Sequence, residues 1–79
     1  MIKNRHELNE LLQKKHYLVV LWTDDPSAHI DYLKQFSKDL RDANAEIKLT
    51  TGDIRVSRFK KPTLEFFMNK QSKEIQELQ

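Results

Sequence analysis

Several side chains capable of chemistry stand close together in the segment Asp24-Asp25-Pro26-Ser27-Ala28-His29. Paired carboxylates such as Asp24 and Asp25 can bind a metal ion or act as acid and base. Neighbouring residues of a loop seldom converge on one point, however, and a helix N-terminus favours acids. We therefore interpret Asp24 and Asp25 as residues that precede and cap a helix.

The hydroxyl of Ser27 and the imidazole of His29 do not form a credible nucleophile and base. They are two positions apart on an expected first helical turn, whereas helical neighbours that face each other are three or four apart. His6 and His16 are distant in the sequence, and no metal-ligand spacing links the three histidines. We predict no catalytic residue, no metal, no cofactor and no enzymatic activity.

A basic cluster is the other group with chemical potential. It consists of Arg55, Arg58, Lys60 and Lys61, with Phe59 among them. Cations can contact phosphates and an aromatic ring can stack on a base, so the cluster is a candidate nucleic-acid-binding site. The whole chain has 14 basic and 12 acidic residues, a net charge of +2, which is not one-sided. Nucleic-acid binding is therefore our alternative prediction.

The composition limits the remaining classes of protein. A length of 79 residues predicts a single small domain, residues 1–79. Cysteine is missing from the sequence, which rules out disulfides, thiol redox chemistry and thiolate metal sites. No apolar run is long enough for a membrane span, and the N-terminus lacks an apolar signal core. We expect a cytoplasmic protein with no membrane partner.

Two helices must position the candidate loop. Asn4, followed by Glu7 in capping-box spacing, predicts a first helix that ends near Lys15. Asp25-Pro26-Ser27 is a helix-start signal, and Asp25 or Ser27 can accept hydrogen bonds from the free amides there. The second helix is predicted to bury one apolar stripe and to end near Ala43. The stripe consists of Ile30, Leu33, Phe36 and Leu40.

Strands complete the predicted organisation, which is of the α/β class. Apolar or alternating runs predict strands over 17–22, 46–50, 63–68 and 73–78. Gly52 is expected in a turn after the second strand, a short helical turn is expected within 54–59, and the last two strands form a hairpin through 69–72. The predicted order is αβαβ followed by ββ.

This order and two stretches resemble the thioredoxin-like family. LVVLWTDDPSAHIDYLKQF, residues 18–36, resembles the strand that ends in a tryptophan before the family's active-site loop and helix. RFKKPTLEFFMNKQSKEI, residues 58–75, resembles the segment in which a cis-proline and a threonine open a strand. The resemblance implies a central mixed sheet, a cis Lys61–Pro62 bond, and a fold truncated before the family's C-terminal helix.

The departures from the family motif imply a redox-inactive member. Pro26 and His29 stand where the two redox cysteines of the CxxC motif would fall, and Val20 stands where a buried aspartate would fall. Thiol exchange requires a thiolate, which neither proline nor imidazole can replace. The resemblance therefore implies a scaffold whose chemistry has been lost.

We predict that such a scaffold binds another protein, as a small inhibitor, adaptor or assembly factor of the kind common among bacterial and phage regulators. Trp22 is open to two interpretations, core packing or an interface anchor. Strands that are apolar on both faces would expose a patch without the covering helix, so a homodimer is a second means of covering it. The predicted interface consists of Trp22, Thr23, Asp24, Asp25, Pro26, His29, Lys60 and Lys61.

Overall fold

The computed structural model describes residues 1–42 and 47–78. Within these residues the chain forms two helices, four strands and two short 3₁₀ helices. In chain order they are α1 (Arg5–Lys14), β1 (Tyr17–Thr23), η1 (Pro26–His29), α2 (Ile30–Asp42), β2 (Lys48–Asp53), η2 (Ile54–Val56), β3 (Thr63–Met68) and β4 (Gln71–Glu77). The predicted order, αβαβ followed by ββ, is confirmed.

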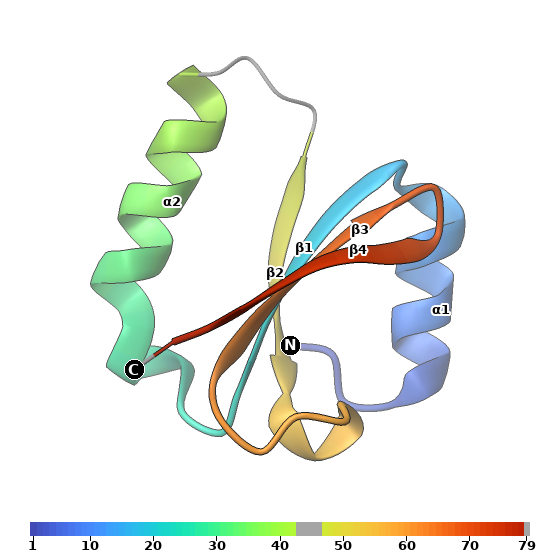
Figure 1. The fold of residues 1–79 in the computed structure, drawn as a ribbon, viewed down its shortest axis with the longest axis horizontal. Coiled ribbons are helices and arrows are strands. Elements are labelled where there is room, and N and C mark those ends of the chain that lie inside the picture. Colours follow the sequence, from blue (N-terminus) through green and yellow to red (C-terminus); the bar gives the residue numbers. More distant parts are fainter. Residues whose placement is uncertain (43–46, 79) are drawn as a thin grey trace.

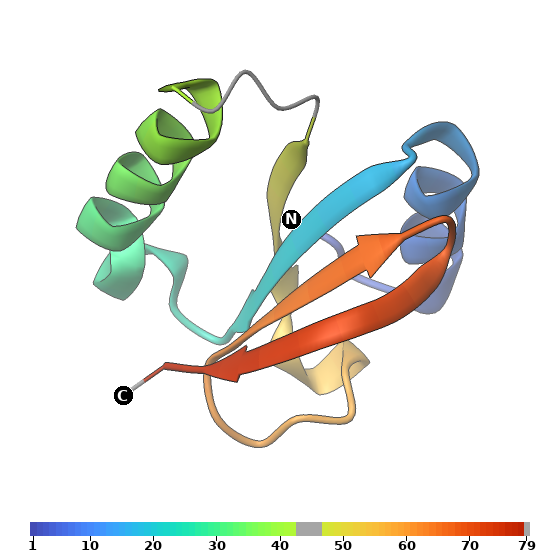
Figure 2. The ribbon, with the colours of Figure 1, turned by 45° about the horizontal axis from the view of Figure 1, so that its top comes forward.

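The strands form one mixed sheet with the order β2-β1-β3-β4. Strand β1 is parallel to β2 and antiparallel to β3, and β4 is antiparallel to β3. Figures 1 and 2 show the twisted sheet between α1 and α2, so the described part of the chain is a three-layered α/β unit. The predicted α/β class and central mixed sheet are confirmed.

Helix α1 begins where the sequence predicts. The Asn4 side chain accepts a hydrogen bond from the Glu7 amide at 2.9 Å, and the Glu7 carboxylate accepts one from the Lys3 amide at 3.0 Å. These bonds satisfy amides that a helix leaves free at its start, in a variant of the capping box. On the inner side of the helix, Leu8 is 3% exposed and anchors α1 on the sheet.

The central strand β1 is buried on both faces, as its continuous apolar sequence predicts. Alternate side chains of β1 enter two separate core clusters. The cluster on the α1 face contains Ile2, Leu8, Leu18, Val20, Trp22 and Phe67, and the cluster on the α2 face contains Val19, Leu21 and Leu64. The two helices are therefore held by opposite faces of the same strand.

Helix α2 buries a narrower stripe than the sequence predicts. Leu33 and Phe36 pack on the sheet, and the Phe36 ring meets Phe66 edge-on at 6.1 Å between centroids. Ile30, expected within the stripe, is 50% exposed. The reason is the preceding η1 turn, whose tighter winding changes the direction in which the first residue of α2 points. The predicted end at Ala43 and the side chain of Leu40 lie outside the described residues.

Gly52 lies within β2 and not in a turn, so that prediction is wrong. It is the parallel neighbour of Trp22, and a Cβ atom at this position would fall 2.5 Å from Cε3 of the indole ring. The missing side chain leaves the space in which the indole packs. At the edge of β2 that does not pair with β1, the Ile2 amide donates to the Thr51 carbonyl, and the Ile2 carbonyl accepts from the Asp53 amide, both at 2.9 Å. The predicted first residue of this strand, Glu46, lies outside the described residues.

The Lys61–Pro62 bond is trans, since the described residues contain no cis peptide bond. The predicted cis-proline is therefore wrong. The Thr63 hydroxyl donates to the Lys61 carbonyl at 2.7 Å, and the Leu78 amide donates to the Pro62 carbonyl at 2.8 Å. These bonds fix the entry of the chain into β3 around the isomer that most proline bonds adopt. Pro62 consequently gives no support to the family resemblance.

Strands β3 and β4 form the predicted hairpin, with the turn at Asn69 and Lys70. Both turn residues have positive φ, 53° and 69°, as the favoured two-residue hairpin turn requires. Every residue of β4 is exposed, so this strand is the outer edge of the sheet. The turn lies beside the C-terminal end of α1, because the Asn69 amide donates to the His16 carbonyl at 3.0 Å.

Candidate functional site

The two predicted loop segments meet at one end of the sheet. Trp22 pairs with Thr63 in the antiparallel register of β1 and β3, so the chain leaves β1 beside the point where it enters β3. Figures 1 and 2 show the teal segment after β1 next to the orange segment before β3. We use the name loop face for the surface formed by Asp24, Asp25, Pro26, His29, Lys60 and Lys61.

Buried threonines fix the ends of both loop segments where these join β1 and β3. Thr23 is 0% exposed, and its hydroxyl oxygen accepts a hydrogen bond from the Asp25 amide at 3.1 Å. Thr63 is 1% exposed and donates to the Lys61 carbonyl. Farther from the strands, the carboxylates and lysines of the loop face are exposed, and Pro26 and His29 are half-buried. The loop face thus presents both acidic and basic side chains from a backbone that the two threonines hold in place.

Two residues of the predicted interface, Trp22 and Thr23, do not reach the surface. Both are 0% exposed. The indole packs against Gly52, and its Nε1 donates to Glu65 Oε1 at 2.9 Å. A side chain without exposed surface offers no contact to a partner, so the core interpretation of Trp22 is correct. Ile30, which follows His29 directly and is 50% exposed, is the apolar side chain that borders the loop face.

Glu65 is a buried carboxylate that the sequence reasoning missed. It is 3% exposed and lies on the α1 face of β3. Besides the Trp22 bond, Glu65 Oε2 accepts from the Ser72 hydroxyl at 2.8 Å and pairs with Arg58 at 3.2 Å. The hydrogen-bonding capacity of the buried acid is therefore met by an indole, a hydroxyl and a half-exposed guanidinium.

A sequence signal for Glu65 does exist. It is the single acid in a strand, TLEFFM, that is otherwise apolar on both faces. An acid within such a strand must find buried partners, because an unpaired buried charge is costly. In the sheet, Glu65 lies directly opposite Val20, the position where the family resemblance implies an aspartate. A carboxylate is thus present in this region, on the adjacent strand.

The side chains at the start of α2 do not form a catalytic arrangement. The Ser27 hydroxyl donates to the Asp25 carboxylate at 2.6 Å rather than to His29. Asp25 precedes η1, but its side chain accepts no backbone amide of that turn, so the predicted side-chain cap is wrong at Asp25. The Asp25 carboxylate instead ties Ser27 to the loop. Because the Ser27 hydroxyl donates to Asp25, the His29 imidazole is not placed to accept its proton and activate it as a nucleophile.

The predicted basic cluster is partly neutralised within the chain. Arg55 pairs with Asp53 at 2.7 Å, and this hydrogen-bonded guanidinium lowers the pKa of the Asp53 carboxyl. Arg58 pairs with Glu65 and lies over the Phe59 ring at 4.7 Å. Phe59 itself packs against the core, so a nucleic-acid base could not stack on both faces of its ring. Lys60 and Lys61 remain as exposed cations on the loop face.

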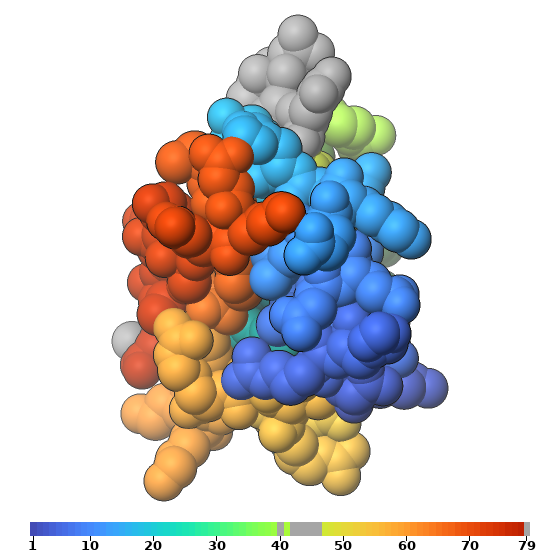
Figure 3. Space-filling view, turned by 90° about the vertical axis from the view of Figure 1, so that its right-hand side faces the viewer, coloured from blue at the N-terminus to red at the C-terminus, as the bar shows by residue number. Residues whose placement is uncertain are grey.

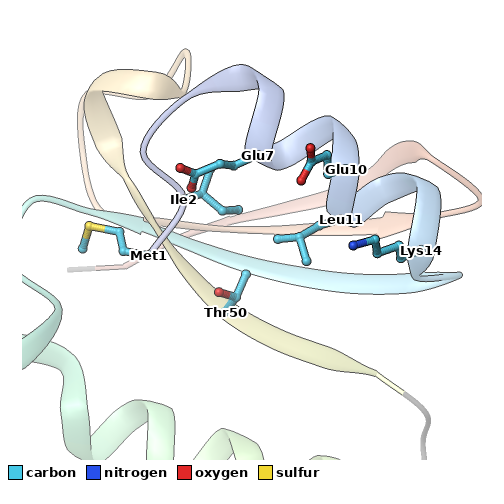
Figure 4. A pocket seen from close by; sticks show the side chains of 7 residues that line it. All are labelled: Met1, Ile2, Glu7, Glu10, Leu11, Lys14 and Thr50. Atoms are coloured by element: carbon cyan, nitrogen blue, oxygen red, sulfur yellow. The ribbon is translucent and has the colours of Figure 1, made fainter.

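A separate hollow lies between α1 and the N-terminal segment (Figure 4). Its volume is about 210 Å³, and two carboxylates, Glu7 and Glu10, are on its rim. Glu7 is occupied as the helix cap, and Glu10 contacts the imidazole of His6 at 2.8 Å. These acids therefore serve α1. Across residues 1–42 and 47–78, no group of three potential metal-ligating side chains is close enough to hold an ion.

Two comparisons, with protein-family models and with curated proteins, found no match. None of the described helices combines the length and the apolar character that a membrane span requires.

Proposed function

We propose that this chain is a non-catalytic protein that acts by binding another protein at the loop face, as a small inhibitor, adaptor or assembly factor. The observation that carries the proposal is the construction of that surface. Two loops from neighbouring strands are fixed at buried Thr23 and Thr63, and they present exposed carboxylates beside exposed lysines. A surface held in place before binding loses little conformational entropy when a partner docks.

The charge pattern favours a protein partner. Among the described residues, no member of the loop face forms a salt bridge, so both its acids and its lysines are available to a partner. A nucleic acid would be repelled by Asp24 and Asp25, and Arg55 and Arg58 are already paired with carboxylates. Ile30, next to the charged residues, adds an exposed apolar side chain, and protein interfaces combine such an apolar core with a polar rim.

We further propose that the architecture is thioredoxin-like and redox-inactive. The order αβαβ followed by a hairpin, with helices on both faces of a mixed sheet, supports this proposal. The trans bond before Pro62 counts against it. Pro26 and His29, at the positions that the resemblance assigns to cysteines, begin and end η1 on the loop face. The proposed interface thus occupies the region where the resemblance places redox chemistry.

The test is capture of a partner by the tagged chain from cells that express it naturally, followed by calorimetry with the purified partner. We expect Ile30→Asp to weaken binding by about thirtyfold, because a charge replaces an apolar contact in the interface. Lys61→Glu should weaken binding by about fivefold, mainly through slower association. Lys38→Glu, the same charge reversal on an exposed position of α2, is the matched control and should bind as wild type.

Native Trp22 fluorescence of each variant checks that the fold is intact, since the indole is buried. Failure to retain any specific protein would refute the proposed function. Equal binding by wild type, Ile30→Asp and Lys61→Glu would place the interface elsewhere and refute the assignment of the loop face.

A further inference from the structure

The opposite end of the sheet carries a second concentration of cations. Tyr17 pairs with Met68 at that end, whereas Trp22 pairs with Thr63 at the loop face. The C-terminal end of α1 meets the β3–β4 turn there: the Asn69 amide donates to the His16 carbonyl, and the Lys70 amine donates to Gln13 Oε1 at 2.9 Å. Figure 3 shows the blue end of α1 beside the orange-red turn.

We use the name basic end for the surface formed by Lys14, Lys15, His16, Lys70 and Lys73, all of which are exposed. Two segments that are distant in the sequence, 14–16 and 70–73, supply these residues. The amines of Lys70 and Lys73 donate to the neutral amides of Gln13 and Gln71, so their charge is uncompensated. This differs from the arginines of the 55–61 cluster, each of which faces a carboxylate.

Two separate hollows, which share no lining residue, adjoin the basic end. One, of about 340 Å³, lies between α1 and the turn and has Lys14, Lys15, His16 and Lys70 on its walls. The other, of about 140 Å³, is wholly apolar apart from Lys73 and is lined by Tyr17, Phe66 and Met68 among others. Among the described residues no carboxylate lines either hollow, and Glu74, next to Lys73 in the chain, is outside both.

Aromatic rings lie at the margin of the basic end, where Tyr17, on the α2 face of the sheet, shares the apolar hollow with Lys73. Tyr17 is 38% exposed in the apolar hollow, and the His16 ring meets it edge-on at 4.4 Å between centroids. An exposed ring beside lysines is the arrangement that binds single-stranded nucleic acid, because a base stacks on the ring while the amines contact phosphates.

The ordinary role of lysines at a helix end does not explain the whole surface. Lys14 and Lys15 are favoured there because a helix C-terminus attracts cations. Lys70 lies in the β3–β4 turn and not at a helix end. Its φ of 69° belongs to a conformation that glycine or asparagine adopts with much less strain. The fold accepts this strain and places the amine between α1 and the turn.

We infer that the basic end binds single-stranded nucleic acid, with phosphates on Lys15, Lys70 and Lys73 and a base stacked on Tyr17. The loop face lies at the other end of the sheet, so this activity is independent of the proposed protein binding. Duplexes are not the expected ligand, because their bases are not free to stack on a protein ring.

The test is fluorescence anisotropy of the full chain with a labelled oligothymidine of about 12 nucleotides. If three lysines contact phosphates, the plot of log affinity against log salt should have a slope of about −2. Lys73→Gln should weaken binding by about fivefold and reduce the slope by about 0.7, the share of one phosphate contact. Tyr17→Leu, which keeps an apolar strand residue, should weaken binding by about tenfold with no change of slope.

Lys70→Gly separates binding from folding. Glycine relieves the positive φ, so this variant should unfold at an equal or higher temperature while its affinity for the oligonucleotide falls by about fivefold. Lys60→Gln and Lys61→Gln remove the same charge at the loop face and should leave the affinity unchanged.

Binding too weak to measure at low salt, a slope near zero, or equal losses in the loop-face controls would each overturn the inference. Tighter binding of polyglutamate than of the oligonucleotide at equal charge concentration would also overturn it, by identifying the basic end as a site for acidic proteins. Stronger binding to a duplex than to a single strand would likewise exclude base stacking on Tyr17.

Discussion

Among single residues, Glu65 has several connections, because its carboxylate links three parts of the chain. Trp22 of β1 and Ser72 of β4 donate to it from within the sheet, and Arg58 reaches it from the segment before β3. The Glu65 side chain is 4% exposed and the Arg58 side chain 56% exposed, so the ion pair joins a buried carboxylate to a side chain that reaches the surface. This group holds the sheet together beneath the segment that leads to the loop face.

Arg58→Met should destabilise the fold, because it leaves the buried Glu65 carboxylate without a counter-charge while keeping an apolar stem over Phe59. We expect a loss of about 2 kcal/mol in the free energy of unfolding. Arg55→Met removes a guanidinium that is 86% exposed, so it is the control and should change stability little. The measurement is urea unfolding followed by Trp22 fluorescence.

A second substitution distinguishes the lost charge from lost packing. Adding Glu65→Gln to Arg58→Met removes the uncompensated charge, so the double variant should be more stable than Arg58→Met alone. If Arg58→Met proves as harmless as Arg55→Met, the ion pair contributes nothing to the fold.

Gly52 is the other residue on which Trp22 depends. Gly52→Ala should cost about 1–3 kcal/mol, because the new Cβ overlaps the indole ring and forces it out of position. The emission of Trp22 should shift to longer wavelength as the ring moves toward water. Thermal unfolding of Gly52→Ala, Trp22→Phe and the double variant measures the coupling, and additive effects would show that the two residues do not interact.

At the scale of elements, η2 is fixed by Asp53 at its start. The Asp53 carboxylate accepts the Arg55 amide at 2.9 Å and pairs with the Arg55 side chain, which lowers the pKa of Asp53. A depressed carboxyl pKa stabilises the folded state at pH values above the unfolded pKa, and that contribution is lost as pH falls through the folded pKa. The ionised cap should therefore weaken only below about pH 4.

We expect Arg55→Ala to raise the pKa of Asp53 toward the value of a free aspartate, because the largest cause of the shift is the side-chain hydrogen bond from Arg55. Nuclear magnetic resonance titration of the Asp53 carboxyl carbon measures it. Arg58→Ala, which removes a guanidinium that pairs with Glu65 instead, should leave that titration unchanged. An unaltered Asp53 titration in Arg55→Ala would contradict the assignment.

At the scale of the whole molecule, the sheet separates two surfaces of different character. The loop face carries both signs of charge at the end where Trp22 pairs with Thr63, and the basic end carries lysines where Tyr17 pairs with Met68. Groups at opposite ends of a rigid sheet share no contacts, so effects of substitutions at the two ends should add.

The whole-molecule prediction is that a chain carrying both Lys61→Glu and Lys73→Gln shows the protein-binding loss of the first and the oligonucleotide-binding loss of the second, each unchanged. Calorimetry with the partner protein and anisotropy with the oligonucleotide provide the two readings. A loss at one end caused by substitution at the other would reveal coupling through the sheet and would contradict a rigid scaffold.

Much of this organisation is determined by local patterns in the sequence. The capping residues at Asn4 and Glu7, the continuous apolar run of β1 and the apolar run of β3 each depend on neighbours within a few positions, so the elements and the α/β class were predictable. These signals act through backbone amides and side-chain spacing, which the sequence displays directly.

Contacts between distant segments were decided by the tertiary structure alone. Gly52 leaves space for Trp22, Glu65 binds Arg58 and Ser72, and Lys70 contacts the end of α1. Each depends on sheet register and on burial, which no local pattern contains. For the same reason Trp22 is a core residue and not an interface anchor: the order of the strands, which places Gly52 on one side of it and Glu65 on the other, excludes it from the surface.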